Sequence, residues 1–349
     1  MIALSPNTTP EDGNENAPSH IEAIEFSRKA YSLIQAEVGK VVIGQSSVIE
    51  EILIAIFTRS HALLVGVPGL AKTLMISTLA QTLQMSFKRI QFTPDLMPSD
   101  ITGTEVIYQD PASGEKLFKF MPGPLFANIV LADEINRTPP KTQAAMLEAM
   151  QERRVTVGGT THKLPTPFFV LATQNPLEQE GTYPLPEAQL DRFMFLINVG
   201  YPSIEDELQV MRMGTGLTPE VPQPVLNGDE IIYIQEAVKL IPVSEHVYRY
   251  AQKIVGSTRP KELQALPYCK KYLGFGAGPR ASLGLIMAAK AHAMINGQAF
   301  VSAANVNAVA LSVMRHRIAV NFSAQSEGIT TDDVVRHILQ ETPQNEALD

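Results

Sequence analysis

The stretch A-L-L-V-G-V-P-G-L-A-K-T, residues 62–73, decides the class of fold. Its four apolar residues predict a short buried strand, its two glycines predict a tight turn, and its Lys-Thr pair opens a helical pattern. This is the order of a phosphate-binding loop, in which backbone N–H groups and a helix N-terminus face phosphate oxygens. Lys72 adds a positive charge for the β- and γ-phosphates, and the Thr73 hydroxyl suits Mg²⁺.

One residue departs from the usual pattern G-x-x-x-x-G-K-[ST], because Ala71 stands where glycine is normal. Gly66 and Gly69 still provide a flexible turn, and Pro68 stiffens it. Ala71 lies where the loop enters the helix, so we expect it to adopt the helical φ and ψ that alanine tolerates well. The alternative is a plain glycine turn between a strand and a helix, with Lys72 solvated.

Two later strand ends favour the nucleotide site over this alternative. The stretch N-I-V-L-A-D-E (128–134) predicts a buried strand that ends in two acids. Asp133 can hold Mg²⁺ through water, and Glu134 can polarise the attacking water. The stretch A-T-Q-N-P (172–176) follows another buried strand and brings an amide that can bridge this water and the γ-phosphate. Three such strand ends together indicate that the chain binds ATP.

Composition limits the classes of protein to be considered. The chain has 349 residues, 45% of them hydrophobic, which is enough for two domains with a substantial core. Its 28 basic and 36 acidic residues argue against broad binding to nucleic acid, and its single cysteine, Cys269, excludes an intramolecular disulfide and a cysteine-based zinc site. The apolar runs are too short for a transmembrane segment, so we expect a cytoplasmic protein. Residues 1–20 have the composition of a disordered tail.

Strands and helices alternate over the first part of the sequence. We expect strands at 62–65, 89–92, 128–132, 168–172 and 193–197, and helices at 21–38, 47–58 and 72–83. This alternation predicts a parallel sheet covered by helices on both faces. From residue 204 to about residue 339 the pattern is almost wholly helical. The chain is therefore expected to divide into an α/β domain at 21–215 and an all-helical domain at 216–349, with a Pro-rich connector at 218–224.

Two stretches of the first domain predict hairpins. Residues 98–121 contain two β-like arms around a D-P-A-S-G turn, and residues 154–164 contain R-V-T-V, G-G-T-T and H-K-L. On their own, these are either plain surface hairpins or working parts. Residues 266–276 form either a loop packed on the helical domain or a patch for a partner. We expect His316 and Arg317 at the surface of that domain.

The chain resembles the AAA+ ATPases, and within them the MoxR family. The residues that carry this resemblance are G-V-P-G-L-A-K-T (66–73), D-E-I-N-R-T-P-P-K-T-Q-A-A-M-L-E-A-M-Q-E (133–152), A-T-Q-N-P (172–176), L-P-E-A-Q-L-D-R-F (185–193) and G-P-R-A-S (278–282). MoxR proteins commonly carry alanine before the P-loop lysine. The resemblance implies an AAA+ P-loop core with a C-terminal all-α lid. It also implies that residues 98–121 are the helix-2 insert and residues 154–164 the pre-sensor-1 hairpin, both facing a central pore.

The resemblance implies roles for the matched positions. Asn175 is similar to sensor 1, Arg192 to an arginine finger that reaches a neighbouring subunit, and Arg280 to sensor 2 at the start of a lid helix. With these, Lys72 and Glu134 complete the implied catalytic set. The implied positions around ATP or ADP are Ile43, Gly44, Gly66, Val67, Pro68, Gly69, Leu70, Ala71, Lys72, Thr73, Leu74 and Asp133. The implied Mg²⁺ ligands are Thr73 and Asp133.

Each arginine also has an alternative. Arg192 could pair with Asp191, in which case its effect would be small. Arg280 could cap or pair locally near the start of its helix. Arg137, just after the two acids, could act between subunits in place of Arg192, and the sequence leaves that open.

The leading hypothesis is an ATP-hydrolysing ring, a hexamer, that closes its lid on the nucleotide and moves its hairpins against a protein client. The resemblance implies a partner with a von Willebrand factor A domain, and through such a partner an indirect association with a membrane. One alternative is a slow, ATP-dependent binding switch or scaffold. A second is a DNA-handling motor, which the acidic balance of the chain disfavours.

Overall fold

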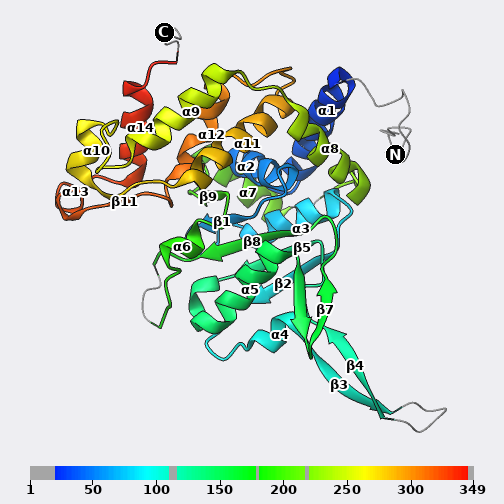
Figure 1. Cartoon of the computed structure of the whole chain (residues 1–349). Helices are drawn as coiled ribbons and strands as arrows, with labels where there is room; N and C mark the ends of the chain where they lie inside the picture. The colour runs from blue at the N-terminus through cyan, green and yellow to red at the C-terminus, as the bar shows by residue number, and fades with distance from the viewer. Residues whose placement is uncertain (1–19, 110–115, 178–180, 217–219, 345–349) are drawn as a thin grey trace, which may run out of the picture.

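The structure is a computed structural model that describes residues 20–109, 116–177, 181–216 and 220–344. Figure 1 shows a sheet with its helices in the lower part of the view and a layer of helices above it. Three expectations fall at least partly outside the described residues: the tail at 1–20, the D-P-A-S-G turn at 110–114, and the start of the connector at 218–224.

The sheet has five parallel strands in the order β2-β5-β8-β1-β9. Their bounds are β1 (Ala62–Val65), β2 (Phe87–Gln91), β5 (Ile129–Asp133), β8 (Phe169–Gln174) and β9 (Phe195–Asn198). Every residue of β5 is buried, as expected for a parallel strand covered on both faces. The predicted parallel sheet is therefore confirmed, with the bounds of β1 unchanged and those of the others shifted by one or two residues.

The sheet separates two hydrophobic cores. Along β1, Leu64 belongs to one core and Leu63 to the other, because successive side chains of a strand point to opposite faces. The helices of this part are α1 (His20–Gly39), α2 (Ser46–Phe57), α3 (Lys72–Thr82), α4 (Pro98–Thr102), α5 (Pro140–Glu152), α6 (Glu187–Leu190) and α7 (Ile204–Thr215). The buried residues of α1, α2 and α3 join the first core, and those of α4 and α5 join the second.

The helices after α7 share the first core with α1 and α2. They are α8 (Gly228–Leu240), α9 (Glu245–Ser257), α10 (Pro267–Tyr272), α11 (Pro279–Ile295), α12 (Ala303–Met314), α13 (Phe322–Ser326) and α14 (Thr331–Glu341). The sequence did not predict the short antiparallel pair β10 (Leu273–Phe275) and β11 (Ala319–Val320). The sequence left two interpretations for residues 266–276, a packed loop or a patch for a partner. The Tyr268 ring stacks on the His337 ring of α14, with centroids 4.0 Å apart, which favours a loop packed on the helical part.

The expectation that His316 and Arg317 lie at the surface was wrong, because both are buried. The Arg317 guanidinium donates to the backbone oxygens of Phe193 and Met194, at 2.6 and 2.9 Å, and to Asp191 Oδ1 at 2.8 Å. An arginine has five donors in a rigid fork, so one side chain can satisfy several acceptors on the chain before β9. Arg317 therefore joins the helical part to the α/β part.

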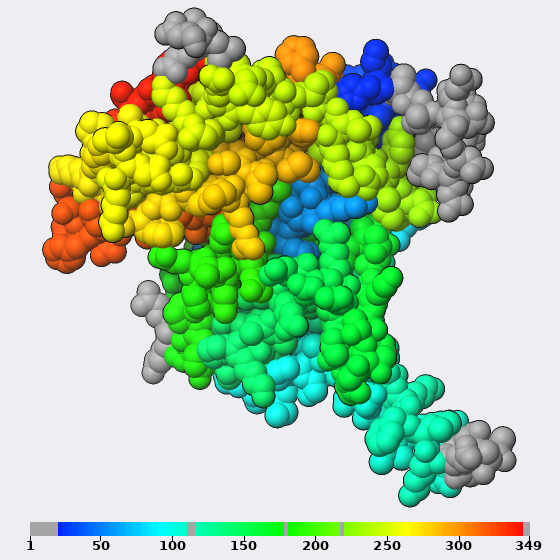
Figure 2. Space-filling view, in the orientation of Figure 1, coloured from blue at the N-terminus to red at the C-terminus, as the bar shows by residue number. Residues whose placement is uncertain are grey.

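Two hairpins extend from the α/β part, as predicted. The longer one consists of β3 (Gly103–Gln109) and β4 (Lys116–Pro122), and it stands out from the body in Figures 1 and 2. The shorter one consists of β6 (Arg154–Val157) and β7 (Thr160–Lys163). The Phe120 ring of β4 stacks on the His162 ring of β7, with centroids 3.9 Å apart and planes 11° from parallel. This contact joins the two hairpins near their bases.

The turn between β1 and α3 needs glycine at one position and accepts alanine at another only with strain. A Cβ at Gly66 would lie 2.9 Å from both Cβ and the backbone oxygen of Val199. Ala71 has φ 53° and ψ 22°, so the expectation that it is helical was wrong. It is the residue before the first helical residue, Lys72, and it adopts a left-handed conformation that costs an L-residue about 1–2 kcal/mol.

We expect Ala71→Gly to raise the free energy of unfolding by about 1 kcal/mol, because glycine adopts a left-handed conformation without strain but gains freedom in the unfolded chain. Urea denaturation measures the change. Ala308→Gly is the matched control, since Ala308 is exposed in the middle of α12. There the same substitution should cost about 1 kcal/mol. Equal losses in the two variants would contradict a left-handed Ala71.

His61, just before β1, is held in one tautomer inside the α/β part. Its Nδ1 accepts from the Val170 N–H at 3.0 Å, so its Nε2 carries the proton and donates to the Met150 oxygen at 3.0 Å. Burial and the nearby Arg153 charge together lower the pKa of His61 to about 4, against the opposing effect of the Met150 hydrogen bond. The folded protein therefore holds His61 neutral at pH values where an unfolded histidine is protonated.

This lowered pKa makes stability depend on pH in a defined window. The contribution of His61 is complete above the unfolded pKa of about 6.5 and falls by up to about 1.4 kcal/mol per pH unit below it, down to the folded pKa. Urea denaturation at pH 7.5, 6.5 and 5.5 should show a steeper loss for wild type than for His61→Gln. His246→Gln, at a partly exposed position, should keep the wild-type slope. The same slope in all three proteins would mean that His61 does not cause the dependence.

Candidate active site

The three polar strand ends predicted from the sequence meet at the carboxyl edge of the sheet. The Gly66 N–H, directly after β1, donates to the backbone oxygen of Gln174 in β8 at 3.3 Å. The Glu134 N–H donates to Thr173 Oγ1 at 2.9 Å, and Thr173 Oγ1 donates to Asp133 Oδ1 at 2.6 Å. The phosphate-loop strand, the acidic strand end and the amide strand end are thus directly connected.

Lys72 begins α3 and turns its side chain back over the loop, where Nζ donates to the Gly66 oxygen at 2.6 Å. Partial burial lowers the pKa of Lys72, and the charges of Asp133 and Glu134 act in the opposite direction. The lysine is therefore a partly desolvated cation beside two carboxylates and a helix N-terminus. This arrangement fits a polyphosphate, since phosphate oxygens would replace the single carbonyl that Lys72 now contacts.

Asp133 is buried and carries a cation partner that the sequence did not predict. Its Oδ2 accepts from Arg89 Nε at 3.0 Å and from Arg89 Nη2 at 2.6 Å. A buried carboxylate needs such a partner. Mg²⁺ prefers oxygen ligands, and the Asp133 carboxylate and the Thr73 hydroxyl are both of this type. Asp133 and Thr73 are the residues that would hold this ion.

Glu134 is held by two further donors. It has φ 57°, a left-handed conformation that is costly for any residue but glycine and that occurs mainly at functional sites. Its Oε2 accepts from Gln91 Nε2 at 2.7 Å and from Arg137 Nη1 at 2.9 Å. Gln91 also accepts from Arg89 Nη2 at 2.7 Å, so one network joins both acids to β2. Arg137, left open by the sequence, lies within this network.

The contacts made by β2 were missed, although a signal was present. Residues 89 and 91 are two apart on a predicted strand, so their side chains point to the same face. The register then pairs Gln91 with Asp133 on the neighbouring strand. Only the pairing of β2 with β5 shows that this face of β2 lies at the site, and the sequence does not predict that pairing.

Asn175 and the segment Ile43–Gly44 lie around the same edge. Asn175 is buried directly after β8, between the strands that lead to the loop and to the acids, and its Oδ1 accepts from the Leu177 N–H at 3.1 Å. Gly44 has φ 73°, and a Cβ there would lie 2.7 Å from Asp206 Oδ2 in the first turn of α7. The segment is thus in contact with the start of α7.

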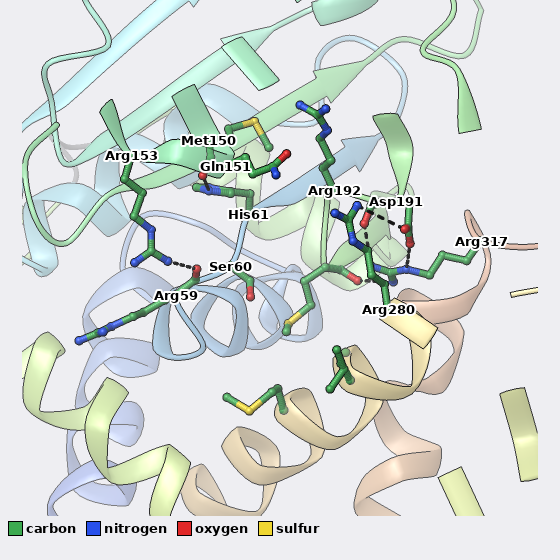
Figure 3. Close-up of a pocket in the computed structure, with 14 residues that line it drawn as sticks. Arg59, Ser60, His61, Met150, Gln151, Arg153, Asp191, Arg192, Arg280 and Arg317 are labelled. Carbon is green, nitrogen blue, oxygen red and sulfur yellow. Dashed lines mark hydrogen bonds and ion pairs between the residues drawn. The ribbon is translucent and has the colours of Figure 1, made fainter. Parts of the chain in front are cut away.

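Arg192 and Arg280 lie elsewhere. Both line a cavity of about 500 Å³ whose wall also includes Arg59 and His61, which precede β1 (Figure 3). Because Arg192 likewise precedes β9, this cavity is at the amino edge of the sheet. Residues of a strand rise about 3.3 Å each, so β1 alone separates the two edges by roughly 10 Å. The structure brings Arg192 and Arg280 together and separates both from the phosphate loop of the same chain.

The acid between these arginines is Asp191. It accepts from Arg317 Nε at 2.8 Å and lies 3.5 Å from Arg280 Nη1. A local partner for Arg280 therefore exists, although the pair is long and solvent-exposed and contributes little. Asp191 is not paired with Arg192, which is exposed. The alternative in which Arg192 merely pairs with Asp191 does not match the contacts of this carboxylate.

Two other kinds of feature are absent over the described ranges. No group of three or more His, Cys, Asp or Glu residues there could hold a metal ion. No helix among the described residues is both long enough and apolar enough to cross a membrane.

Comparison with known proteins gives consistent matches. Residues 61–195 match the ATPase family associated with various cellular activities (AAA), and residues 268–338 match the AAA lid domain. The chain is 44% identical to Chaperone MoxR1 of Mycobacterium tuberculosis over 87% of its own length and 79% of that protein. It is 42% identical to the protein YeaC of Bacillus subtilis over 86% of its length and 91% of that protein.

A solved structure agrees with these sequence matches. The crystal structure of a putative ATPase from Cytophaga hutchinsonii has a TM-score of 0.86 and 43% identity, covering 93% of this chain and 98% of that one. The fold is therefore the AAA+ fold, with a lid domain at its C-terminal end. Identity of this extent with a MoxR chaperone, over most of both chains, means that the protein belongs to the MoxR family of AAA ATPases.

Proposed function

We propose that this protein hydrolyses ATP as a ring, a hexamer, in which adjacent subunits complete each other's sites, and that it uses the energy to remodel a protein client. The observation that carries the proposal is the separation of the site into two halves. Lys72, Asp133 and Glu134 lie at the carboxyl edge of the sheet, and Arg192 and Arg280 at the amino edge. Copies packed side by side would place the arginines of one against the acids of the next.

Each residue then has a distinct task. Lys72 and the backbone N–H groups of the loop bind the phosphates, and the Asn175 amide orients the attacking water. Glu134 accepts a proton from this water. Arg192, from the adjacent subunit, stabilises the charge that develops on the transferred phosphoryl group. Mg²⁺ held by Thr73 and Asp133 would neutralise phosphate charge.

The exposed helix α7 supports assembly. None of its residues is buried, and three of its large apolar side chains lie on one side at positions i, i+4 and i+7. They are Ile204, Leu208 and Met211, with Ile204 75% exposed. Contiguous exposed apolar surface of this kind marks protein contact sites. We assign this face to contact between subunits.

The β3–β4 hairpin supports a polypeptide client. Ile107 and Phe118, opposite each other, are 67% and 74% exposed on one face, and Tyr108 and Leu117 are exposed on the other. Apolar and aromatic side chains on a projecting hairpin suit contact with an extended or partly unfolded chain. Following the family resemblance, the client we propose carries a von Willebrand factor A domain, meets this protein in the cytoplasm, and provides any association with a membrane.

Two other functions remain as alternatives. The contacts of Arg89, Gln91 and Arg137 with the two acids favour slow turnover, as in a nucleotide-dependent switch. The β6–β7 hairpin argues against a DNA-handling motor. His162 is stacked on Phe120, which leaves Lys163 as the basic side chain of β7. The other exposed basic side chain of this hairpin, Arg154, is paired with Glu152, so little unpaired positive charge remains for tracking a nucleic-acid strand.

Glu134→Gln should bind ATP with near wild-type affinity. Its turnover rate should fall by a factor of about 10²–10⁴, because the amide cannot accept the proton. Lys72→Ala should instead weaken binding, since it removes the charge over the loop. Fluorescent-nucleotide titration and phosphate release separate the two effects. Glu245→Gln, on the exposed surface of α9, is the control and should be unchanged. Full turnover in Glu134→Gln would exclude Glu134 as the base.

Activity per subunit should rise steeply with protein concentration, because each site needs an arginine from another copy. The ATPase rate of Arg192→Ala should be lower than that of wild type by a factor of about 10³ at every concentration. Arg249→Ala, an exposed arginine on α9, should follow the wild-type curve. Sedimentation of the same samples tests whether activity rises with assembly. A flat wild-type curve together with an active Arg192→Ala would show that each subunit is self-contained, and the switch would then be preferred.

A further inference from the structure

The cavity at the amino edge carries more positive charge than the two arginines assigned above. Five arginines and one acid line it among the described residues: Arg59, Arg153, Arg192, Arg280, Arg317 and Asp191. Figure 3 shows Asp191, Arg280 and Arg317 at one end of the cavity and Arg59 and Arg153 at the other. His61 adds no charge near neutral pH, because burial holds its pKa at about 4.

Three of the five arginines contact a carboxylate of the same chain. Asp191 contacts Arg317 and Arg280, at 2.8 and 3.5 Å. Arg59 reaches away from the cavity to Glu236 on α8, at 2.6 Å. The two cations for which the described residues supply no carboxylate within ion-pair distance are Arg192, already assigned to the adjacent nucleotide, and Arg153.

Arg153 is positioned for binding a ligand and is costly to keep without one. Its Nη2 donates to the backbone oxygen of Arg59 at 3.0 Å, which directs the guanidinium along the cavity wall. Desolvation lowers the pKa of Arg153, and the charge of Arg59 lowers it further. Arg153 also ends α5 with φ 53°, where glycine is unstrained. Arg153 therefore combines a left-handed backbone, desolvation and a like-charged neighbour, and backbone strain of this kind occurs mainly at functional sites.

We propose that Arg153 is a third cation of the inter-subunit site and binds phosphate oxygens of the nucleotide held by the adjacent copy of this chain. The proposal rests on the ring function proposed above. A guanidinium matches phosphate geometry with two parallel hydrogen bonds, and a cavity of about 500 Å³ has room for a triphosphate. Arg153 directly precedes β6, so the same contact would link the adjacent nucleotide to the β6–β7 hairpin.

The first test measures anion binding without relying on hydrolysis. In Lys72→Ala protein, whose own phosphate loop is impaired, calorimetric titration with inorganic tripolyphosphate reports on the arginine cavity. Adding Arg153→Gly should weaken binding about tenfold or more, and Arg153→Lys by less, because charge remains without the bidentate fork. Arg153→Gly suits the left-handed backbone, so loss of binding with unchanged or higher thermal stability excludes misfolding as the cause.

The matched control is Arg154→Ala, next in sequence, whose guanidinium is exposed, pairs with Glu152 at 3.1 Å and does not line the cavity. It should leave tripolyphosphate affinity unchanged. Equal affinity in Arg153→Gly and its parent would overturn the assignment. So would an equal loss in Arg154→Ala, because any nearby positive charge would then suffice.

The second test asks which subunit supplies Arg153. Arg153→Gly alone should have reduced ATPase activity, and Lys72→Ala alone should have almost none. When the two are mixed, Lys72→Ala subunits present an intact Arg153 to nucleotide bound by Arg153→Gly subunits, so activity should exceed the sum of the separate proteins. No gain in a mixture that co-assembles would overturn action between subunits. If wild type fails to hydrolyse ATP although tripolyphosphate binding depends on Arg153, the proposed function fails and the anion site stands.

Discussion

The parallel register of β1 with its two neighbours is the constraint on which the site depends. Val65 is paired with Gln174 on one side and Asn198 on the other, so three strands end at the same level. The pairing of Ala132 with Ala172 brings the acidic end of β5 to the same edge, so main-chain pairing determines where the loop, the acids and the amide lie. A shift of one residue in β1 would also exchange Leu63 and Leu64 between the two cores. Packing on both faces thus protects the geometry of the edge.

The two edges of the sheet carry different charged groups, and the strand register determines which groups lie at each edge. At the carboxyl edge, Arg89 and Arg137 neutralise Asp133 and Glu134, and Lys72 adds a positive charge. The amino edge holds the arginine-lined cavity. Nucleotide phosphates bound at the carboxyl edge would supply the negative charge that complements the arginine-lined cavity of an adjacent copy. This complementarity favours a head-to-tail ring and disfavours symmetric pairing of like edges.

Local patterns in the sequence were sufficient for the elements and the motifs. The strand at 62–65 is apolar and ends in a glycine, and the strand that ends at Asp133 is apolar to its tip, so both were predictable within a residue. Contacts between distant segments were not predictable. The pairing of Arg89 with Asp133 depends on strand order, and the burial of Arg317 depends on how the helical part packs on the chain before β9. The left-handed Ala71 was missed because helical φ and ψ were expected for the residue that enters the helix, although the helix begins at Lys72 as predicted.

Arg317 and Asp191 give the lid a direct physical connection to the arginine proposed to act between subunits. Burial lowers the pKa of Arg317, while hydrogen bonding and attraction to Asp191 oppose that shift, so the pair is held together in a low-dielectric region. Asp191 is adjacent in sequence to Arg192, and Arg317 follows α12 of the helical part. Separating the two would leave a buried cation without its partner, at a cost of several kcal/mol. The helical part and the loop that carries Arg192 should therefore move as one body, and a change in the lid would reposition Arg192 against the adjacent nucleotide.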